Sequence, residues 1–96
     1  MQVICVVGFI DADALKKITP ERMKAEADYV RSLYAQDIVR QVWSKAGGGG
    51  ALLMLEVPSE GEAVRLMSGL PFVKDGLLRI EQTYSLAPYR GFGSAS

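Results

Sequence analysis

The chain has 96 residues, enough for one small domain, and its eleven basic and eleven acidic residues cancel to a formal net charge of zero. No basic stripe runs along it, which argues against a nucleic-acid partner. The absence of histidine excludes Ser-His-Asp and Cys-His catalysis and most transition-metal sites, so no metal site is expected. A hydrophobic fraction of 49% is high for so small a domain and predicts that a partner covers part of the surface.

The first strand is expected in Val3–Ile10, an apolar run without alternation that is typical of a central strand buried on both faces. Cys5 lies within it and is expected to be a reduced core residue. No secretory signal or membrane-spanning run is visible, so we expect a cytoplasmic protein that does not use a membrane as a partner. Residues 1–93 are expected to form the single domain, and 94–96 a disordered tail or a remnant of cloning.

Asp11–Ile18 is expected to be a polar loop. Its two aspartates resemble a fragment of a calcium loop, but the glycine and terminal glutamate of that motif are missing, so we interpret them as solvated. A helix should then begin at Thr19-Pro20-Glu21, which combines a cap, a proline suited to the first turn and an acid at the positive end of the dipole. This helix should end near Ala35.

The apolar stripe of this first helix is predicted to centre on four residues, with Leu33 beside them. At about 100° per residue, Glu26 lies on the margin of the stripe rather than on the polar side. The four stripe residues are Met23, Ala27, Val30 and Tyr34.

A β-hairpin is predicted in the middle of the chain, from Ile38–Trp43 and Ala51–Val57 joined by Gly47–Gly50. Glycine takes positive φ freely, so the turn closes without Cβ strain. Four glycines are more than a tight turn needs. They fit either a mobile hairpin tip or a backbone that must closely approach a ligand or a neighbouring subunit.

The second half repeats the pattern of strand and helix. Ser59 and Glu62 fit a capping box, and Gly69 and Pro71 should end the helix that follows. A loop is expected over 72–76, then a strand over 77–86. In this strand Leu78, Ile80, Tyr84 and Leu86 should share one face, with Arg79, Glu81, Thr83 and Ser85 on the other.

The order βαββαβ is the ferredoxin-like pattern, so we predict an α+β fold with a four-stranded antiparallel sheet and helices on one face. The apolar strands predict that a second copy covers the other face, forming a dimeric α/β barrel in a homodimer or a larger ring. Residues 88–92 of the tail carry two aromatic residues with nothing in the monomer to bury them, and we expect them to pack on another subunit.

Several stretches resemble the muconolactone isomerase-like branch of the dimeric α/β-barrel proteins. They are the acidic first helix around Glu26, VRQVWSKAG at 39–47, the Leu-Pro at 70–71 and TYSLAPY at 83–89. The resemblance implies a proton shift within a small unsaturated lactone, without metal or organic cofactor, in ring-shaped oligomers. The wider superfamily includes cofactor-free monooxygenases and cyclases of aromatic polyketides. Where those enzymes carry polar and aromatic groups this chain has Gly48–Leu52, which favours either a different and larger ligand or lost catalysis.

Glu26 and Arg40 are the candidate catalytic residues. Without histidine, a carboxylate is a natural general base, and partial burial on the helix margin would raise the pKa of Glu26 toward neutrality. The alternative is a surface glutamate paired with a lysine or arginine. Arg40, expected on the strand face of Ile38 and Val42, could hold a substrate carboxylate or an enolate oxygen. It could equally pair with Glu26 or Glu81.

Trp43, Tyr84 and Tyr89 are the candidate substrate-binding residues, because their rings and hydroxyls could contact a polar aromatic ligand. Burial or subunit packing is the alternative for each. The leading hypothesis is thus a cofactor-independent isomerase or cyclase that moves a proton on a lactone or on an aromatic or polyketide-like carbonyl compound. The alternatives are a cofactor-free monooxygenase of an aromatic polyketide and a non-catalytic small-molecule-binding or assembly module.

Overall fold

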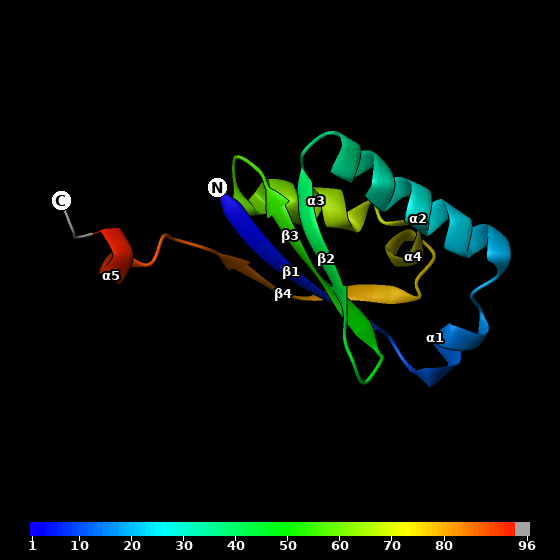
Figure 1. The fold of residues 1–96 in the computed structure, drawn as a ribbon. Coiled ribbons are helices and arrows are strands. Elements are labelled where there is room, and N and C mark those ends of the chain that lie inside the picture. The colour runs from blue at the N-terminus through cyan, green and yellow to red at the C-terminus, as the bar shows by residue number, and fades with distance from the viewer. Residues whose placement is uncertain (94–96) are drawn as a thin grey trace.

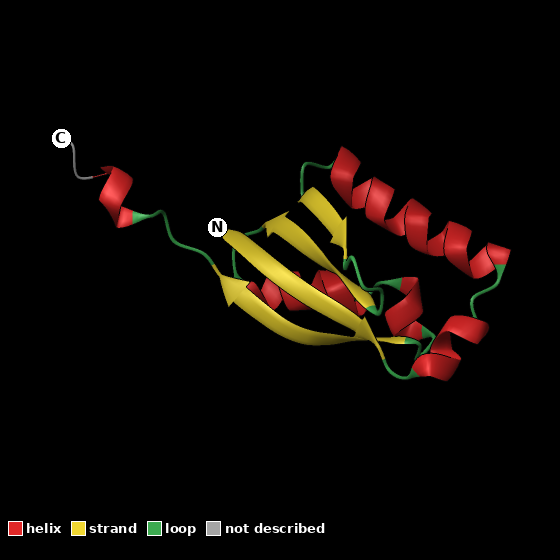
Figure 2. Cartoon of the chain, turned by 60° about the horizontal axis from the view of Figure 1, so that its bottom comes forward, coloured by secondary structure: helices red, strands yellow, loops and turns green. Residues whose placement is uncertain are grey.

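The computed structural model describes residues 1–93, which form an antiparallel four-stranded sheet covered by helices on one face (Figure 1). The strands are β1 Gln2–Phe9, β2 Val39–Ser44, β3 Gly50–Glu56 and β4 Leu78–Ser85, in the spatial order β2-β3-β1-β4. The long helices are α2 Pro20–Ala35 and α3 Glu60–Ser68, which lie on the same side of the sheet in Figures 1 and 2. This arrangement confirms the predicted ferredoxin-like fold. None of the helices within residues 1–93 is long and apolar enough to cross a membrane.

Helix α1, Ala12–Lys16, lies where a polar loop was expected. The side chain of Asp11 accepts a hydrogen bond from the backbone N–H of Ala14 at 2.9 Å and so caps the helix. Asp13 lies in the first turn, where a carboxylate is favoured by the helix dipole. The expectation of a loop was wrong here. The two aspartates of the Asp-Ala-Asp motif are not part of a calcium loop; they mark the start of a helix instead.

Helix α4, Pro71–Lys74, replaces most of the second expected loop. Proline suits its first turn, and Gly76 follows it with φ of 74°. The N–H of Gly76 donates to the carbonyl of Val73, and the N–H of Leu77 to that of Phe72, which is the Schellman ending. Both signals, Pro and Gly, were present in the sequence at the right spacing.

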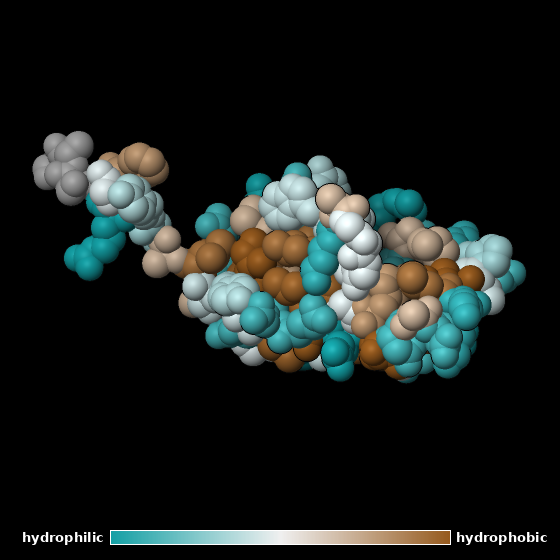
Figure 3. Space-filling model, turned by 90° about the horizontal axis from the view of Figure 1, so that it is seen from below, coloured by the Kyte–Doolittle hydropathy of each residue, from teal (hydrophilic) through white to brown (hydrophobic). Residues whose placement is uncertain are grey.

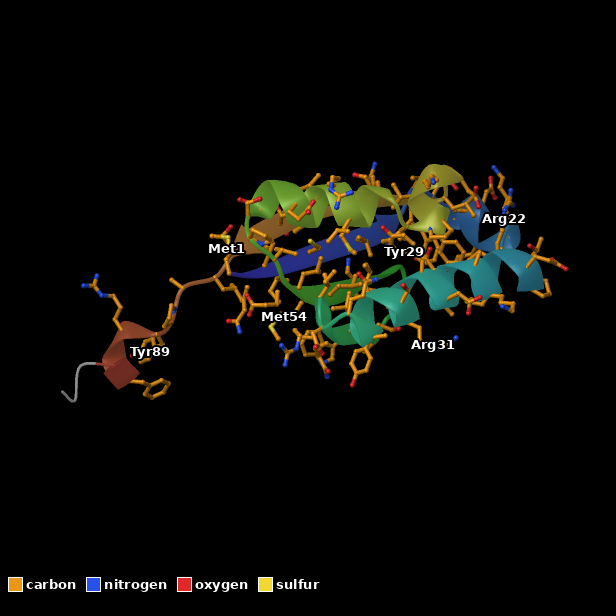
Figure 4. The ribbon with its side chains drawn as sticks, turned by 90° about the horizontal axis from the view of Figure 1, so that it is seen from above. Met1, Arg22, Tyr29, Arg31, Met54 and Tyr89 are labelled. Carbon is orange, nitrogen blue, oxygen red and sulfur yellow. The ribbon has the colours of Figure 1, made fainter. Side chains whose placement is uncertain are left out.

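Helix α2 buries a different stripe from the one predicted. Leu33 is buried and Glu26, Tyr29 and Val30 are half-buried, whereas Met23 and Tyr34 are 52% and 63% exposed. The Tyr29 hydroxyl donates to the carbonyl oxygen of Leu66 at 2.6 Å, and Figure 4 shows this side chain between α2 and the neighbouring helices. The buried face of α2 is thus rotated toward Tyr29, whose hydroxyl joins α2 to α3.

The core lies between the sheet and the helices, and β1 runs through its centre. Val3, Cys5 and Val7 are at most 2% exposed, while Ile4 and Val6 on the other face are only half-buried. Within one chain, these side chains of β1 are therefore fully buried on the helix-covered face and half-buried on the other face, although both faces of this strand were expected to be buried. Burial also raises the pKa of the Cys5 thiol to about 11, with a further contribution from the charge of Glu60.

A β-bulge in β4 redistributes its side chains. Val6 of β1 pairs with Gln82 while Val7 pairs with Ile80, so Glu81 is the extra residue. Beyond the bulge, Thr83 and Ser85 lie on the helix-covered face of the sheet, and both hydroxyls donate to the Glu60 carboxylate at the start of α3. Tyr84 lies on the opposite face, which no helix within residues 1–93 covers and which we call the open face. The predicted grouping of Tyr84 with Leu78 and Ile80 was wrong because strict alternation does not continue through a bulge.

The glycine run between β2 and β3 contacts the chain's own first strand. Gly48 and Gly49 have φ of 82° and 89°, and the carbonyl of Gly49 accepts a hydrogen bond from Phe9 N–H at 3.0 Å. A Cβ on Gly50 would overlap the backbone carbonyl of Val7. The last glycine of the run therefore approaches the backbone of β1 closely, whereas an approach of the run to a ligand or another subunit stays a prediction.

We predict that Gly50→Ala lowers the free energy of unfolding by about 1–3 kcal/mol, because the added methyl group meets backbone that cannot move aside easily. Gly47→Ala is the matched control, since a Cβ there meets nothing within 4 Å and its φ is not positive. Urea denaturation of both variants measures the difference. Equal stability of the two variants would contradict the close approach at Gly50.

Candidate functional site

A cavity of about 230 Å³ opens between the helix-covered face of the sheet and helices α2 and α4. All four strands contribute to its wall because the side chains that alternate toward the helices meet there. It is lined by Val7, Phe9, Glu26, Val30, Val42, Ser44, Gly50, Ala51, Leu53, Leu70, Phe72 and Leu78. The wall is apolar apart from two side chains, those of Glu26 and Ser44.

Glu26 is held at this wall by helix α4. Its Oε1 accepts a hydrogen bond from the backbone N–H of Phe72 at 2.9 Å, and this N–H is one of the unpaired donors at the start of α4. Oε1 is therefore engaged, whereas no hydrogen bond to Oε2 occurs within residues 1–93. One residue therefore both caps a helix and presents a carboxylate to an apolar space.

The surroundings of Glu26 raise the pKa of its carboxyl group. Burial is the main cause, since it disfavours the charged form, and the nearby Asp75 adds repulsion, while the N–H of Phe72 acts in the opposite direction. Asp75 is itself paired with Arg22 at 3.4 Å. A carboxylate with a raised pKa is a better general base than an ordinary surface glutamate.

Aromatic rings form one side of the cavity. The centroids of Phe9 and Phe72 are 6.2 Å apart with an interplanar angle of 45°. Such a tilted pair presents ring edges and faces to an adjacent planar molecule. The cavity therefore offers apolar and aromatic contact, with one carboxylate and one hydroxyl as the polar groups.

Arg40 does not lie in this wall. Val39 pairs with Leu55 and Gln41 with Met54, so Arg40 is the extra residue of a bulge in β2. Both Val39 and Val42 face the helices, which leaves Arg40 and Gln41 between them on the side of Met54. The expectation that Arg40 shares the face of Val42 was therefore wrong, because the bulge changes the alternation. A catalytic role for Arg40 stays a prediction that this placement does not support.

The three predicted aromatic contacts also lie outside the cavity. Trp43 is 45% exposed opposite Leu52 on the open face of the sheet, and Tyr84 is on the same face, donating to Gln82 at 2.6 Å. Tyr89 is 70% exposed in the segment after β4, which extends away from the body of the protein in Figures 1 and 4. Of the five predicted residues, the structure thus brings only Glu26 to the cavity.

Sequence reasoning missed Ser44, Phe9 and Phe72 as lining residues. Ser44 is two residues beyond Val42 and therefore on its face, a signal that counting forward from Val42 would have provided. Phe72 could be found only by recognising α4. No cluster of three or more histidine, cysteine, aspartate or glutamate residues that could hold a metal ion occurs within residues 1–93.

No family model matches the sequence, and no curated protein matches it either. Among solved structures, the chain is similar to the 5-chloro-2-hydroxyhydroquinone dehydrochlorinase TftG from Burkholderia phenoliruptrix AC1100, in complex with 2,5-dihydroxybenzoquinone. The TM-score is 0.76 over 95% of this chain and 98% of that chain, at 17% sequence identity. This likeness establishes the fold. Membership of the muconolactone isomerase-like family stays a prediction.

The raised pKa of Glu26 predicts a pH-dependent stability. A carboxyl group whose pKa is higher in the folded than in the unfolded chain stabilises the fold below its ordinary pKa of 4.5, and this contribution is lost as pH rises through the folded value. Glu26→Gln removes the titration and keeps an oxygen for Phe72 N–H. We therefore expect the variant to gain stability relative to the parent as pH increases across this window.

Urea denaturation at a series of pH values above and below 4.5 measures this difference. Glu21→Gln, on the exposed first turn of the same helix, is the control and should retain the Glu26-dependent slope. A stability difference between the Glu26→Gln variant and the parent that stayed constant with pH would contradict the assigned environment of Glu26.

Proposed function

We propose that this protein is a cofactor-independent enzyme, an isomerase or cyclase, that moves a proton on a small cyclic carbonyl compound. The observation that carries the proposal is the Glu26 carboxyl group at the wall of an apolar cavity with a raised pKa. Perturbed carboxylates in apolar cavities are characteristic of general bases. Glu26 is the base in this proposal, and no cofactor takes part.

The chemistry follows from the two oxygens of Glu26. Oε1 stays bonded to Phe72 N–H, so the carboxylate keeps its orientation while Oε2 takes a proton from the carbon next to a substrate carbonyl. The electrons of the broken C–H bond form the enolate. The protonated Glu26 then returns the proton to another carbon of the same substrate, which completes an isomerisation. Alternatively, the enolate carbon attacks a second carbonyl of the same substrate, whose C=O π electrons form an alkoxide, and Glu26 gives its proton to this alkoxide, which completes a cyclisation and restores the carboxylate.

The structural neighbour supports a ligand of this kind. TftG is a dehydrochlorinase that was solved with 2,5-dihydroxybenzoquinone, a small ring that carries carbonyl and hydroxyl oxygens. A protein with a similar fold therefore binds a small oxygenated ring. The cavity of this chain, lined by Phe9 and Phe72, has the apolar and aromatic character that a ring compound requires.

A binding module without turnover is the second candidate, and one observation favours it. The Glu26 contact with Phe72 N–H is complete within the protein, so a purely structural role would explain the position of the carboxylate. In that case Glu26 is a helix cap between α2 and α4, and ligands bind in the cavity unchanged.

We predict that Glu26→Gln lowers turnover by about a hundredfold or more, because it removes the base while keeping size and the Phe72 hydrogen bond. The assay is exchange of the C–H protons next to the carbonyl group for deuterium in uncharged cyclic ketones, followed by NMR. Oxygen consumption is recorded in parallel, because a monooxygenase would deprotonate its substrate in the same cavity and then consume oxygen.

Glu21→Gln is the control variant and should retain full exchange activity, since Glu21 is exposed on the first turn of α2. Thermal melts of both variants show whether lost activity reflects lost folding. Ligand binding without proton exchange in the parent protein would favour the binding module over the enzyme.

We also propose that two copies pack through the open faces of their sheets. Apolar side chains gather on the face seen from below in Figure 3, bordered by hydrophilic ones. Val42, by contrast, belongs to the cavity on the opposite face. The residues with side chains on the open face include Ile4, Val6, Trp43, Leu52, Met54 and Tyr84. Exposed apolar surface of this extent is typical of an interface, and an isologous dimer would cover it on both copies.

We predict that Trp43→Asp converts a dimer into a monomer at micromolar concentration, because a carboxylate within an apolar interface loses its hydration without a partner. Tyr34→Asp is the matched control, since Tyr34 is an exposed aromatic residue on α2. Sedimentation velocity measures the assembly. A parent protein that sediments as a monomer would contradict the proposal, as would equal dissociation of both variants.

A further inference from the structure

We propose that the cavity selects an uncharged ring compound with a phenolic or carbonyl oxygen, that it rejects rings carrying a carboxylate, and that the Ser44 hydroxyl is the specificity contact. This inference rests on the proposed function, since it concerns the ligand of the same cavity. Within that function it favours the aromatic or polyketide-like carbonyl compounds over acidic lactones.

The charges around the cavity carry the first step. None of the residues that line it within 1–93 is a lysine or arginine, and its single ionisable side chain is the acid Glu26. A ligand carboxylate placed there would lose hydration without gaining a cation and would face a second carboxylate. An uncharged ring meets neither penalty.

Two cations of the neighbouring segments are paired with acids, and a third faces away from the helices. Arg22 pairs with Asp75, and Lys45 pairs with Glu81 at 3.3 Å. Arg40 lies in the bulge of β2 on the side of Met54. Each of these groups would have to leave its present position to neutralise an anion beside Glu26.

The dimensions of the cavity carry the second step. An apolar cavity of about 150 Å³ is known to hold a benzene ring, so about 230 Å³ is suited to a substituted single ring or two fused rings. The tilted rings of Phe9 and Phe72 would contact such a planar ligand.

Ser44 carries the third step. Ser44 is exposed on β2 and its side chain lines the cavity, and no hydrogen bond of its hydroxyl occurs within residues 1–93. A hydroxyl both donates and accepts, so it can bind either a carbonyl or a phenolic oxygen. With Glu26 partly engaged by Phe72 N–H, Ser44 is the free polar group that distinguishes an oxygenated ring from a bare one.

Three probes test the proposal by calorimetric titration of the full chain at pH 7.5. They are 2-naphthol, 2-naphthoate and naphthalene, which share one ring system and differ in a hydroxyl, a carboxylate or neither. We expect 2-naphthol to bind at least tenfold more tightly than 2-naphthoate. Ser44→Ala should weaken 2-naphthol roughly three- to tenfold, the effect of one hydrogen bond, and leave naphthalene unchanged.

Ser68→Ala is the matched control, since Ser68 is exposed on α3 and donates to the carbonyl of Val64, away from the cavity lining. Binding of 2-naphthoate as tightly as 2-naphthol would overturn the proposal, as would the absence of binding by 2-naphthol. Equal weakening of 2-naphthol and naphthalene by Ser44→Ala would overturn the role of Ser44.

The outcomes separate this inference from the proposed function. If 2-naphthol binds selectively but no compound exchanges a proton at Glu26, the selectivity stands and the catalytic proposal fails. If Glu26→Gln abolishes proton exchange while carboxylate-bearing rings bind best, the catalytic proposal stands and the selectivity is wrong.

Discussion

The hydrogen bond from Phe72 N–H to the Glu26 carboxylate joins the two helical segments that enclose the cavity. Helix α4 is only one turn long and cannot satisfy its own first N–H groups. A side chain from α2 satisfies one of them and thereby places both Phe72 and Leu70 at the cavity wall. The same contact keeps a carboxylate at the edge of an apolar space, where a group without a partner would be strongly disfavoured. The packing of α4 against α2 and the proposed role of Glu26 as a base thus both depend on the hydrogen bond from Phe72 N–H.

The two bulges decide which side chains share a surface. In β2 the bulge leaves Arg40 on the side away from the helices, and in β4 the bulge takes Tyr84 to that side and Thr83 to the helices. Near the second bulge, Glu81 lies over Gly8, where a Cβ would collide with its carboxylate, and it reaches Lys45 at the end of β2. An ion pair therefore links segments from the two outer strands across the open face.

Much of the fold could be predicted from local chemistry, because its signals are local. Thr19 and Ser59 cap the two long helices as expected, accepting from the N–H groups of Arg22 and Glu62. The position of Glu26 on a helix margin also follows from helical periodicity alone. Its actual partner does not, because a backbone N–H has no signature in the amino-acid sequence and α4 brings it from 46 residues away.

The errors have a common physical cause. Alternation along a strand and periodicity along a helix assume uninterrupted geometry and an apolar buried face. The bulges break the first assumption, which misplaced Arg40 and Tyr84. Tyr29 breaks the second, since its hydroxyl finds the Leu66 carbonyl and allows a polar-tipped residue to replace Met23 and Tyr34 on the buried side. The expectation for residues 94–96 lies outside the described part of the chain.

The burial of Cys5 has a practical consequence. It is the chain's single thiol, lies on the central strand with no exposed surface, and has a pKa of about 11. Only the thiolate attacks alkylating reagents, so in the folded protein at neutral pH the sulfur is both inaccessible and almost entirely protonated. Its labelling rate then reports how often β1 separates from its neighbours. The rate at which Cys5 is alkylated, followed by mass spectrometry, therefore measures opening of the core without any engineered label.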